Sequence, residues 1–246
     1  MDRQAQKALK PLLDSVTESA IRIWQDDMLS LFHDAQNRFP DIVWEMEDGR
    51  GGSSEKIWGH RAIIHARIPS GSQSQGLSMP SHGSTWPDFT SRASIGFRRL
   101  EIPLTNGSSY FIDELRYLYT NQSLIDFQKD SGLNIGRDEL QEDLNSMLRS
   151  QQYADIEIAV PDRGSPWCVP VVFPSHRFIL SSRSPYFFRI LAQSHEEERN
   201  KRSKIALPYS SFTPKSFSFI LGYLYSGTLK FTQHEWDLTT AFYIYR

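Results

Sequence analysis

The chain has 246 residues, of which 39% are hydrophobic and 13% aromatic, and its formal net charge at pH 7 is -2. This length suits two small domains, and the composition is that of a globular protein and excludes a disordered one. The near-neutral charge gives no electrostatic basis for nucleic acid or a membrane as a direct partner. The single cysteine, Cys168, excludes an intramolecular disulfide and fits a reducing compartment, so we expect the chain in the cytoplasm and/or the nucleus.

The N-terminal segment, residues 1–38, is predicted to be an amphipathic helix. Its apolar residues recur at helical spacing from about Ala8 to Asn37. We expect Pro11 to interrupt the start of this helix, because proline lacks the backbone donor that a helix interior needs. Asp14 and Ser15 would then cap its restart.

Residues 39–127 are predicted to form a first small domain of mixed strands and helices. In chain order, the spacing of apolar residues predicts strands at Asp41–Met46 and Lys56–Trp58, a short helix at Arg61–Ala66, a strand at Arg99–Leu104 and a helix from Tyr110 to about Thr120. Residues 69–97 are rich in Ser, Gly and Pro and poor in apolar spacing, which predicts an insertion that is partly disordered.

A polar linker and a helix, residues 128–150, lead into a second domain at residues 151–246. The central feature of this domain is the stretch from Val171 to Ala192, in which a short strand is followed by a short helix and then by a second helix. Ser184 is the predicted N-cap of the second helix, and Pro185 occupies its first turn. Further helices are predicted at Pro214–Tyr225 and from His234 to Arg246.

Separated segments of the second domain carry a family resemblance. In chain order they are Ala154-Asp155-Ile156, His176-Arg177, Ser182-Arg183-Ser184-Pro185-Tyr186-Phe187, Ile205-Ala206-Leu207-Pro208 and the segment from Phe217 to Leu229. Together they resemble the BTB/POZ family of protein-interaction domains, from Tyr153 to Arg246. The resemblance implies an α+β fold, a helical cluster with a short flanking sheet. Because further helices normally follow in this family, it also implies that the second domain is incomplete at its C-terminus.

The two predicted domains repeat the same order of parts. Asp41 and Asp155 each open an apolar strand, and the pairs His60-Arg61 and His176-Arg177 each stand where a strand turns into a helix. We therefore interpret the chain as a tandem pair of BTB-like domains with a degenerate first copy. The second helix of the hairpin has no counterpart in the first copy, which either lacks it or replaces it with the insertion at residues 69–97.

No arrangement of residues in the sequence predicts an enzyme. The seven histidines lack the spacing of metal ligands, and a single cysteine excludes a zinc knuckle. Since His60 and His176 occupy matched places, we expect each to hydrogen-bond the backbone where the strand turns into the helix. The matched aspartates need partners if they are buried, and the arginine after each histidine is the obvious cation. No nucleophile motif, phosphate-binding loop or dinucleotide fingerprint is present, so we expect no catalytic, cofactor-binding or metal-binding residues.

The family resemblance implies a protein-interaction surface in the second domain. BTB/POZ domains carry an aspartate and a basic residue at these matched places, beside their dimer interface, which implies a role in packing and assembly. The residues assigned to the surface are Asp155, His176, Arg177, Leu180, Ser184, Tyr186, Phe187, Phe188 and Phe231. Among them, Phe187 and Phe188 are expected to supply much of the interface energy.

The resemblance also implies a groove for a cullin near the end of the helix at 214–225. Some cullin-binding members carry an aromatic or aliphatic residue two positions before an acid in the segment that follows this helix. Here Phe231 is followed two positions later by Gln233, and Glu235 stands two residues further on. That cullin-binding pattern is therefore not met.

Two functions remain open from the sequence. The first is a non-enzymatic module that associates with itself or with another BTB protein and recruits unknown substrate proteins to a cullin-based ubiquitin ligase. The alternative is a BTB-containing transcriptional or chromatin regulator whose DNA-binding part is not in this chain. The basic run Lys201-Arg202-Ser203-Lys204 is either a solvated loop or an aid to nuclear import.

Overall fold

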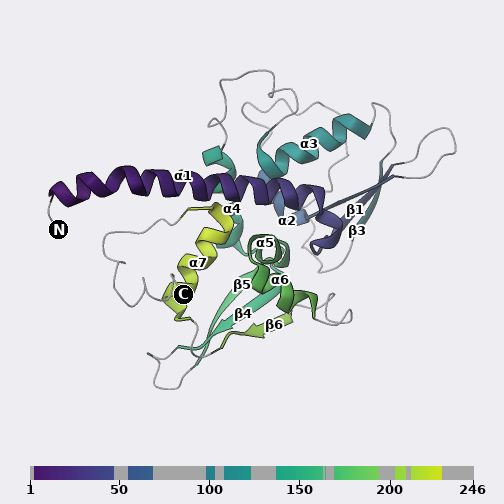
Figure 1. Ribbon diagram of the computed structural model, residues 1–246. Helices are drawn as coiled ribbons and strands as arrows, with labels where there is room; N and C mark the ends of the chain where they lie inside the picture. The colour runs from purple at the N-terminus through teal and green to yellow at the C-terminus, as the bar shows by residue number, and fades with distance from the viewer. Residues whose placement is uncertain are drawn as a thin grey trace.

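The computed structural model describes residues 3–46, 55–68, 98–102, 108–122, 137–162, 164, 169–193, 203–208 and 212–228. These residues form two halves, which we call the N-terminal half (3–122) and the C-terminal half (137–228). Each half contains a small sheet with helices packed beside it, and the long helix α1 runs across the molecule where the two halves meet (Figure 1).

The helices and strands follow one another in the same way in both halves. The N-terminal half contains α1 (Arg3–His33), η1 (Ala35–Asn37), β1 (Ile42–Met46), β2 (Glu55–Gly59), α2 (Arg61–Arg67), β3 (Arg98–Ile102) and α3 (Ser108–Thr120). The C-terminal half contains α4 (Arg137–Ser150), β4 (Ile156–Val160), β5 (Val171–Ser175), α5 (Arg177–Arg183), α6 (Pro185–Ala192), β6 (Ser203–Ala206) and α7 (Pro214–Ser226). These elements confirm the order of strands and helices predicted within residues 39–226.

Helix α1 corrects one expectation, because it passes through Pro11 without a break. A proline inside a helix removes one backbone hydrogen bond and costs about 3 kcal/mol. The rest of the helix is firmly anchored, since Trp24, Met28 and Leu31 are almost completely buried. Their burial offsets the local cost, since each large apolar side chain removed from water contributes roughly 1.5–3 kcal/mol.

The two sheets have the same strand order and the same strand directions. Strand β1 lies between β2 and β3, antiparallel to the first and parallel to the second. Strand β4 lies between β5 and β6 with the same two directions. The register matches as well, because Ile42 opposes Gly59 and Ile156 opposes Ser175. Each of these partners stands directly before a histidine, so the two sheets present their histidines in the same way.

The hydrophobic core runs without interruption through the described parts of both halves. One cluster of buried apolar side chains includes Trp24 and Trp44 in the N-terminal half and Ile156, Phe178 and Tyr225 in the C-terminal half. Helix α1 packs against α3 in its own half and against α5 and α7 in the other, while α4 packs against α7 and against α2. The halves therefore fold against one another as one body.

The hairpin of α5 and α6 has the local chemistry expected from its sequence. The Ser184 hydroxyl caps α6 by accepting the Phe187 N–H at 3.4 Å, and Pro185 occupies the first turn, where no donor is needed. Helix α7 starts with a capping box between Thr213 and Ser216. It ends at Gly227, whose φ of 71° is the left-handed conformation that glycine adopts readily.

Several sequence expectations lie outside the described residues. They concern the insertion at 69–97, Cys168, the basic run's first two residues, Lys201 and Arg202, and the segment from Leu229 to Arg246 with Phe231 and the last predicted helix. Among the helices that the structure does describe, none combines the length and apolar character needed to span a membrane.

Candidate functional site

Each half holds a buried histidine between a tyrosine hydroxyl and a backbone carbonyl. The Nδ1 atom of His60 lies 2.7 Å from the Tyr119 hydroxyl, and its Nε2 lies 2.8 Å from the carbonyl oxygen of Arg38. His176 repeats the arrangement, with 2.7 Å from Nδ1 to the Tyr225 hydroxyl and 2.7 Å from Nε2 to the carbonyl of Gln152. The expectation that these histidines hydrogen-bond the backbone is therefore confirmed.

The partners of His60 and His176 fix their tautomer. A carbonyl oxygen only accepts, so Nε2 carries the proton and donates it, and Nδ1 accepts from the tyrosine hydroxyl. Burial lowers the pKa of His60 to about 4, which keeps its ring neutral near pH 7. Burial also raises the pKa of both Tyr119 and Tyr225, so both hydroxyls stay protonated and can donate. Each histidine is thereby a structural clamp that ties the segment before the first strand to the last described helix of its half, α3 for His60 and α7 for His176.

The matched aspartates hold the first turn of the helix that follows each histidine. Asp41 accepts from the backbone N–H of Arg61 at 2.7 Å and from its side-chain Nε at 3.0 Å. Asp155 accepts from the backbone N–H of Arg177 at 2.8 Å. These amides lie at helix starts, where backbone donors lack partners within the helix. The predicted ion pair of Asp41 with Arg61 is confirmed. For Asp155, Arg177 supplies a backbone donor and a positive charge that lowers the aspartate pKa.

The environment of Asp155 makes its carboxyl weakly acidic. Removal from water raises the pKa of Asp155 to about 7, although the hydrogen bond and positive charge of Arg177 lower it. The nearby charge of Asp41 adds a further increase in that pKa. Desolvation likewise raises the pKa of Asp41, against the opposing influence of Arg61. The charge of Asp41 thus raises the pKa of Asp155 across the boundary between the halves.

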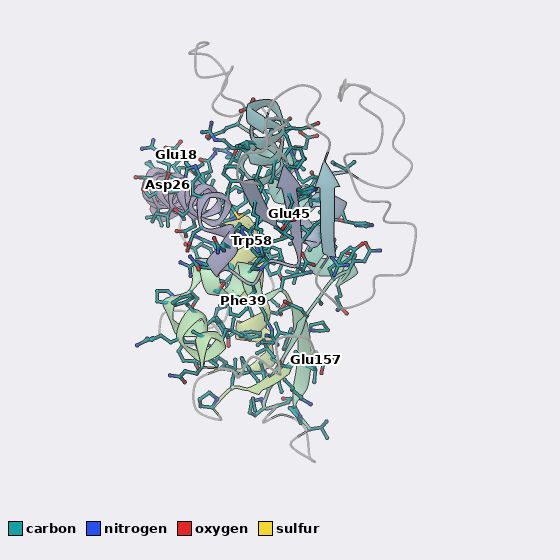
Figure 2. All side chains as sticks on the ribbon, turned by 90° about the vertical axis from the view of Figure 1, so that its right-hand side faces the viewer. Glu18, Asp26, Phe39, Glu45, Trp58 and Glu157 are labelled. Carbon is teal, nitrogen blue, oxygen red and sulfur yellow. The ribbon has the colours of Figure 1, made fainter. Side chains whose placement is uncertain are left out.

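Arg177 is buried where the C-terminal half meets the N-terminal half. Its guanidinium hydrogen-bonds the Ser203 hydroxyl at the start of β6. Its Cζ lies 5.8 Å from the ring centre of Phe39, which precedes β1. Figure 2 shows Phe39 at the junction of the two halves, whereas Glu45 and Trp58 lie within one half and Glu157 lies within the other. Arg177 therefore contacts both halves.

The remaining residues assigned to the interaction surface divide into buried and accessible ones. Leu180 and Phe187 are buried in the core, where Phe187 lies edge-on to Phe217, and Ser184 serves as the α6 cap. Tyr186 and Phe188 remain 38% and 37% exposed on α6. Of the two phenylalanines expected to supply interface energy, Phe188 is thus the accessible one. That role stays a prediction.

Sequence reasoning missed three side chains that complete this region. Arg38 donates to the Ser181 carbonyl at 3.2 Å and places its guanidinium 4.4 Å above the Phe188 ring. Trp24 donates from Nε1 to the Tyr225 carbonyl at 2.9 Å, and Gln141 donates to the Ser226 carbonyl at 2.6 Å. Their acceptors are distant backbone carbonyls, which leave no mark on the sequence. Among the described residues, no group of three or more histidine, cysteine, aspartate or glutamate side chains is placed to hold a metal ion.

Comparison with known proteins identifies the domain that carries this region. Residues 144–244 match the family model of the BTB/POZ domain. The chain is 29% identical over 102 residues to BTB/POZ domain-containing protein 9 of Drosophila melanogaster, which covers 42% of this chain and 12% of that protein. It is 32% identical over 90 residues to Kelch-like protein 41 of Mus musculus, covering 37% of this chain and 13% of that protein.

A plant protein is a further relative. Regulatory protein NPR4 of Arabidopsis thaliana is 29% identical over 98 residues, which cover 38% of this chain and 16% of that protein. The chain thus spans only a small part of the length of these relatives. The family match, together with the strand and helix order of the C-terminal half, shows that residues 144–244 are a BTB/POZ domain, a protein-interaction module.

Proposed function

We propose that this chain is a non-enzymatic protein-interaction module that self-associates through BTB-type helices and serves as a substrate adaptor for a cullin-based ubiquitin ligase. The BTB/POZ match over residues 144–244 is the observation that carries the proposal. Two accessible aromatic side chains on α6, Tyr186 and Phe188, supply a surface suited to protein contacts, since aromatic residues are enriched where interfaces derive their energy.

A tandem arrangement is part of this proposal, with residues 39–127 as a degenerate BTB-like domain beside the domain at 151–246. The shared strand order, pairing and register of the two sheets support it. The repeated clamps of His60 and His176 support it further, because the same donor and acceptor atoms recur in both.

The adaptor role is tested by pull-down of the full chain with a purified cullin scaffold. We expect binding that Phe231→Ala weakens, since the family resemblance places this residue near the cullin groove. Val16→Ala is the matched control, because Val16 is an apolar side chain that is 67% exposed on α1. Absence of binding at every cullin concentration tested removes the ligase role and leaves the interaction module.

Residence in the cytoplasm and/or the nucleus belongs to the same proposal. Imaging a tagged chain tests it, with Lys201 and Arg202 changed to glutamine in one variant and Lys215 in a control. A nuclear signal that falls in the first variant alone supports import through the basic run. An unchanged distribution removes that function from the run.

A further inference from the structure

Two arginine–aromatic contacts join the halves reciprocally. The Arg61 guanidinium of the N-terminal half lies 5.4 Å from the Tyr153 ring of the C-terminal half. Conversely, the Arg177 guanidinium lies 5.8 Å from the Phe39 ring. Phe39 and Tyr153 each stand two residues before a matched aspartate and each adopt a left-handed backbone, with φ of 56° and 60°. Each half therefore places an aromatic ring at the same position, where it contacts the matched arginine of the other half.

Two ion pairs repeat this reciprocity. Arg67 at the end of α2 pairs with Asp143 on α4, and Arg183 at the end of α5 pairs with Asp27 on α1. The arginines are 116 residues apart, and so are the aspartates (183 − 67 and 143 − 27). Even the exposure of the side chains matches, at 3% and 2% for the arginines and 31% and 32% for the aspartates. Every member of one pair thus has its counterpart in the other.

The helix contacts between the halves are reciprocal in the same way. Helix α1 crosses to α5 of the C-terminal half, and α4 crosses to α2 of the N-terminal half. Within each half, the corresponding contacts are α1 with α3 and α4 with α7. In an interface with a two-fold axis, the same pair of positions meets twice, once in each direction between the equivalent subunits. The contacts between the two halves follow this rule. The two reciprocal arginine–aromatic contacts and the two ion pairs are called the cross-half interface below.

We propose that the N-terminal half occupies the assembly surface of the BTB/POZ domain, so that one folded chain is the internal counterpart of a symmetric dimer and a second copy of the chain is excluded from this surface. The proposal deepens the BTB-type association proposed above, since it assigns that association to the two halves of one chain instead of to two copies. Because the halves are covalently joined, each faces the other at an effective concentration on the order of millimolar, which a second copy must exceed to compete.

One departure from symmetry favours pairing within the chain over pairing of two C-terminal halves. The Phe178 ring stacks on His60 of the other half at 4.3 Å and lies 5.6 Å from His176 of its own. The residue 116 positions earlier is Ala62, which is small and buried. Two C-terminal halves related by the same axis would bring a second Phe178 ring into this space. A large residue opposite a small one therefore selects the N-terminal half as partner.

Charge reversal in the full chain tests whether the cross-half interface forms within one molecule. Asp27→Arg leaves the buried Arg183 without its partner, and we expect the thermal midpoint to fall by about 5 °C or more. Adding Arg183→Asp to the same chain should raise the midpoint above that of either single variant, at every protein concentration. Asp26→Arg is the matched control, because Asp26 is the exposed neighbour on α1 that Figure 2 labels. It should leave the midpoint almost unchanged.

Mixing the two single variants separates the two modes of pairing. If pairing occurred between copies, a mixed pair of an Asp27→Arg chain and an Arg183→Asp chain would have opposite charges at positions 27 and 183 in each of its two interfaces. We expect no recovery on mixing. Recovery that appears only in the mixture, or a doubly reversed chain no more stable than the single ones, overturns the proposal. Loss of cullin binding has no bearing on these outcomes, so failure of the adaptor role is distinguished from failure of this inference.

Discussion

Trp24 of α1 lies directly against Gly227 at the end of α7, with no room for a side chain between them. A Cβ atom placed on Gly227 would lie 2.6 Å from the Trp24 Cβ. The Trp24 indole also donates to the Tyr225 carbonyl in the last turn of α7, and the Tyr225 hydroxyl in turn holds His176. The first helix of the N-terminal half is thereby connected to the histidine clamp of the BTB/POZ domain.

Gly227→Ala should lower the free energy of unfolding by about 2 kcal/mol or more. The left-handed backbone costs a side chain about 1–2 kcal/mol, and contact with Trp24 adds the cost of overpacking. Gly222→Ala is the control, because a Cβ there meets nothing within 4 Å and lies inside α7. That change should stabilise by about 0.5–1 kcal/mol. Urea unfolding measures both, and equal effects at the two positions would contradict the packing described here.

Exchanging the sizes of residues 62 and 178 probes the axis between the halves. Ala62→Phe should destabilise by about 1–3 kcal/mol through overpacking, and Phe178→Ala by about 3–5 kcal/mol through a cavity. In the double variant the ring moves to the position related by the axis, beside His176. The double loss should then be smaller than the sum of the single losses by about 0.5 kcal/mol or more. Simple additivity in the unfolding data would mean that the two positions do not share one space.

Removing the tyrosine hydroxyls tests the histidine clamps. Tyr119→Phe and Tyr225→Phe each leave a buried histidine Nδ1 without its donor, and each should cost about 1–3 kcal/mol of unfolding free energy. Tyr225→Phe should cost more than Tyr119→Phe, because the Tyr225 hydroxyl also accepts from the buried backbone N–H of His176 at 3.0 Å. Tyr223→Phe keeps the ring beneath Arg183 and is the control. A clamp variant as stable as this control would show that its hydroxyl contributes nothing.

Asp155 should make the protein less stable as pH rises through neutrality. Its folded pKa of about 7 lies above the ordinary carboxyl value of 3.8, so its contribution to stability is fully present below about pH 3.8 and is lost as pH rises to about 7. His60 changes the stability with pH in the opposite direction. Burial lowers its pKa from 6.5 to about 4, so its contribution to stability is lost as pH falls through that range. Between about pH 4 and pH 6.5 the two effects on stability oppose one another, and from about pH 6.5 to about pH 7 the effect of Asp155 remains.

Asp155→Asn isolates this dependence while keeping an oxygen that accepts from the Arg177 N–H. The unfolding free energy of the wild type should fall from about pH 6.5 until the folded pKa of about 7 is passed and then level off, and this fall should shrink in the variant. Asp41 shares the direction of the shift and accounts for part of what remains. Identical pH slopes in the two proteins would show that Asp155 is ionised throughout.

Much of the fold was predictable because its helices and strands are indicated by local sequence patterns. Periodic apolar residues marked the helices and strands, and Ser184-Pro185 marked the start of α6. The matched histidines and aspartates were also found, since both halves repeat them at corresponding places. The arginine partners of the two aspartates were also predicted, because each arginine directly follows a matched histidine in the sequence.

The contacts between the halves were not predictable in the same way. Asp27 and Asp143 are charged residues on amphipathic helices, which normally face solvent, and nothing local distinguishes them from Asp26. The left-handed backbones of Phe39 and Tyr153 are disfavoured for large side chains and are set by the surrounding structure. Relationships between distant surfaces depend on packing, which periodicity does not encode.

The mass of the full chain in solution tests the pairing of its halves most directly. Sedimentation across a wide range of concentrations should give the mass of one chain, 28.4 kDa, with the cross-half interface intact. The Asp27→Arg and Asp26→Arg variants serve as perturbed and control proteins. A mass of two chains that falls to that of one in Asp27→Arg, but not in Asp26→Arg, would show that the interface joins separate copies and would contradict the account.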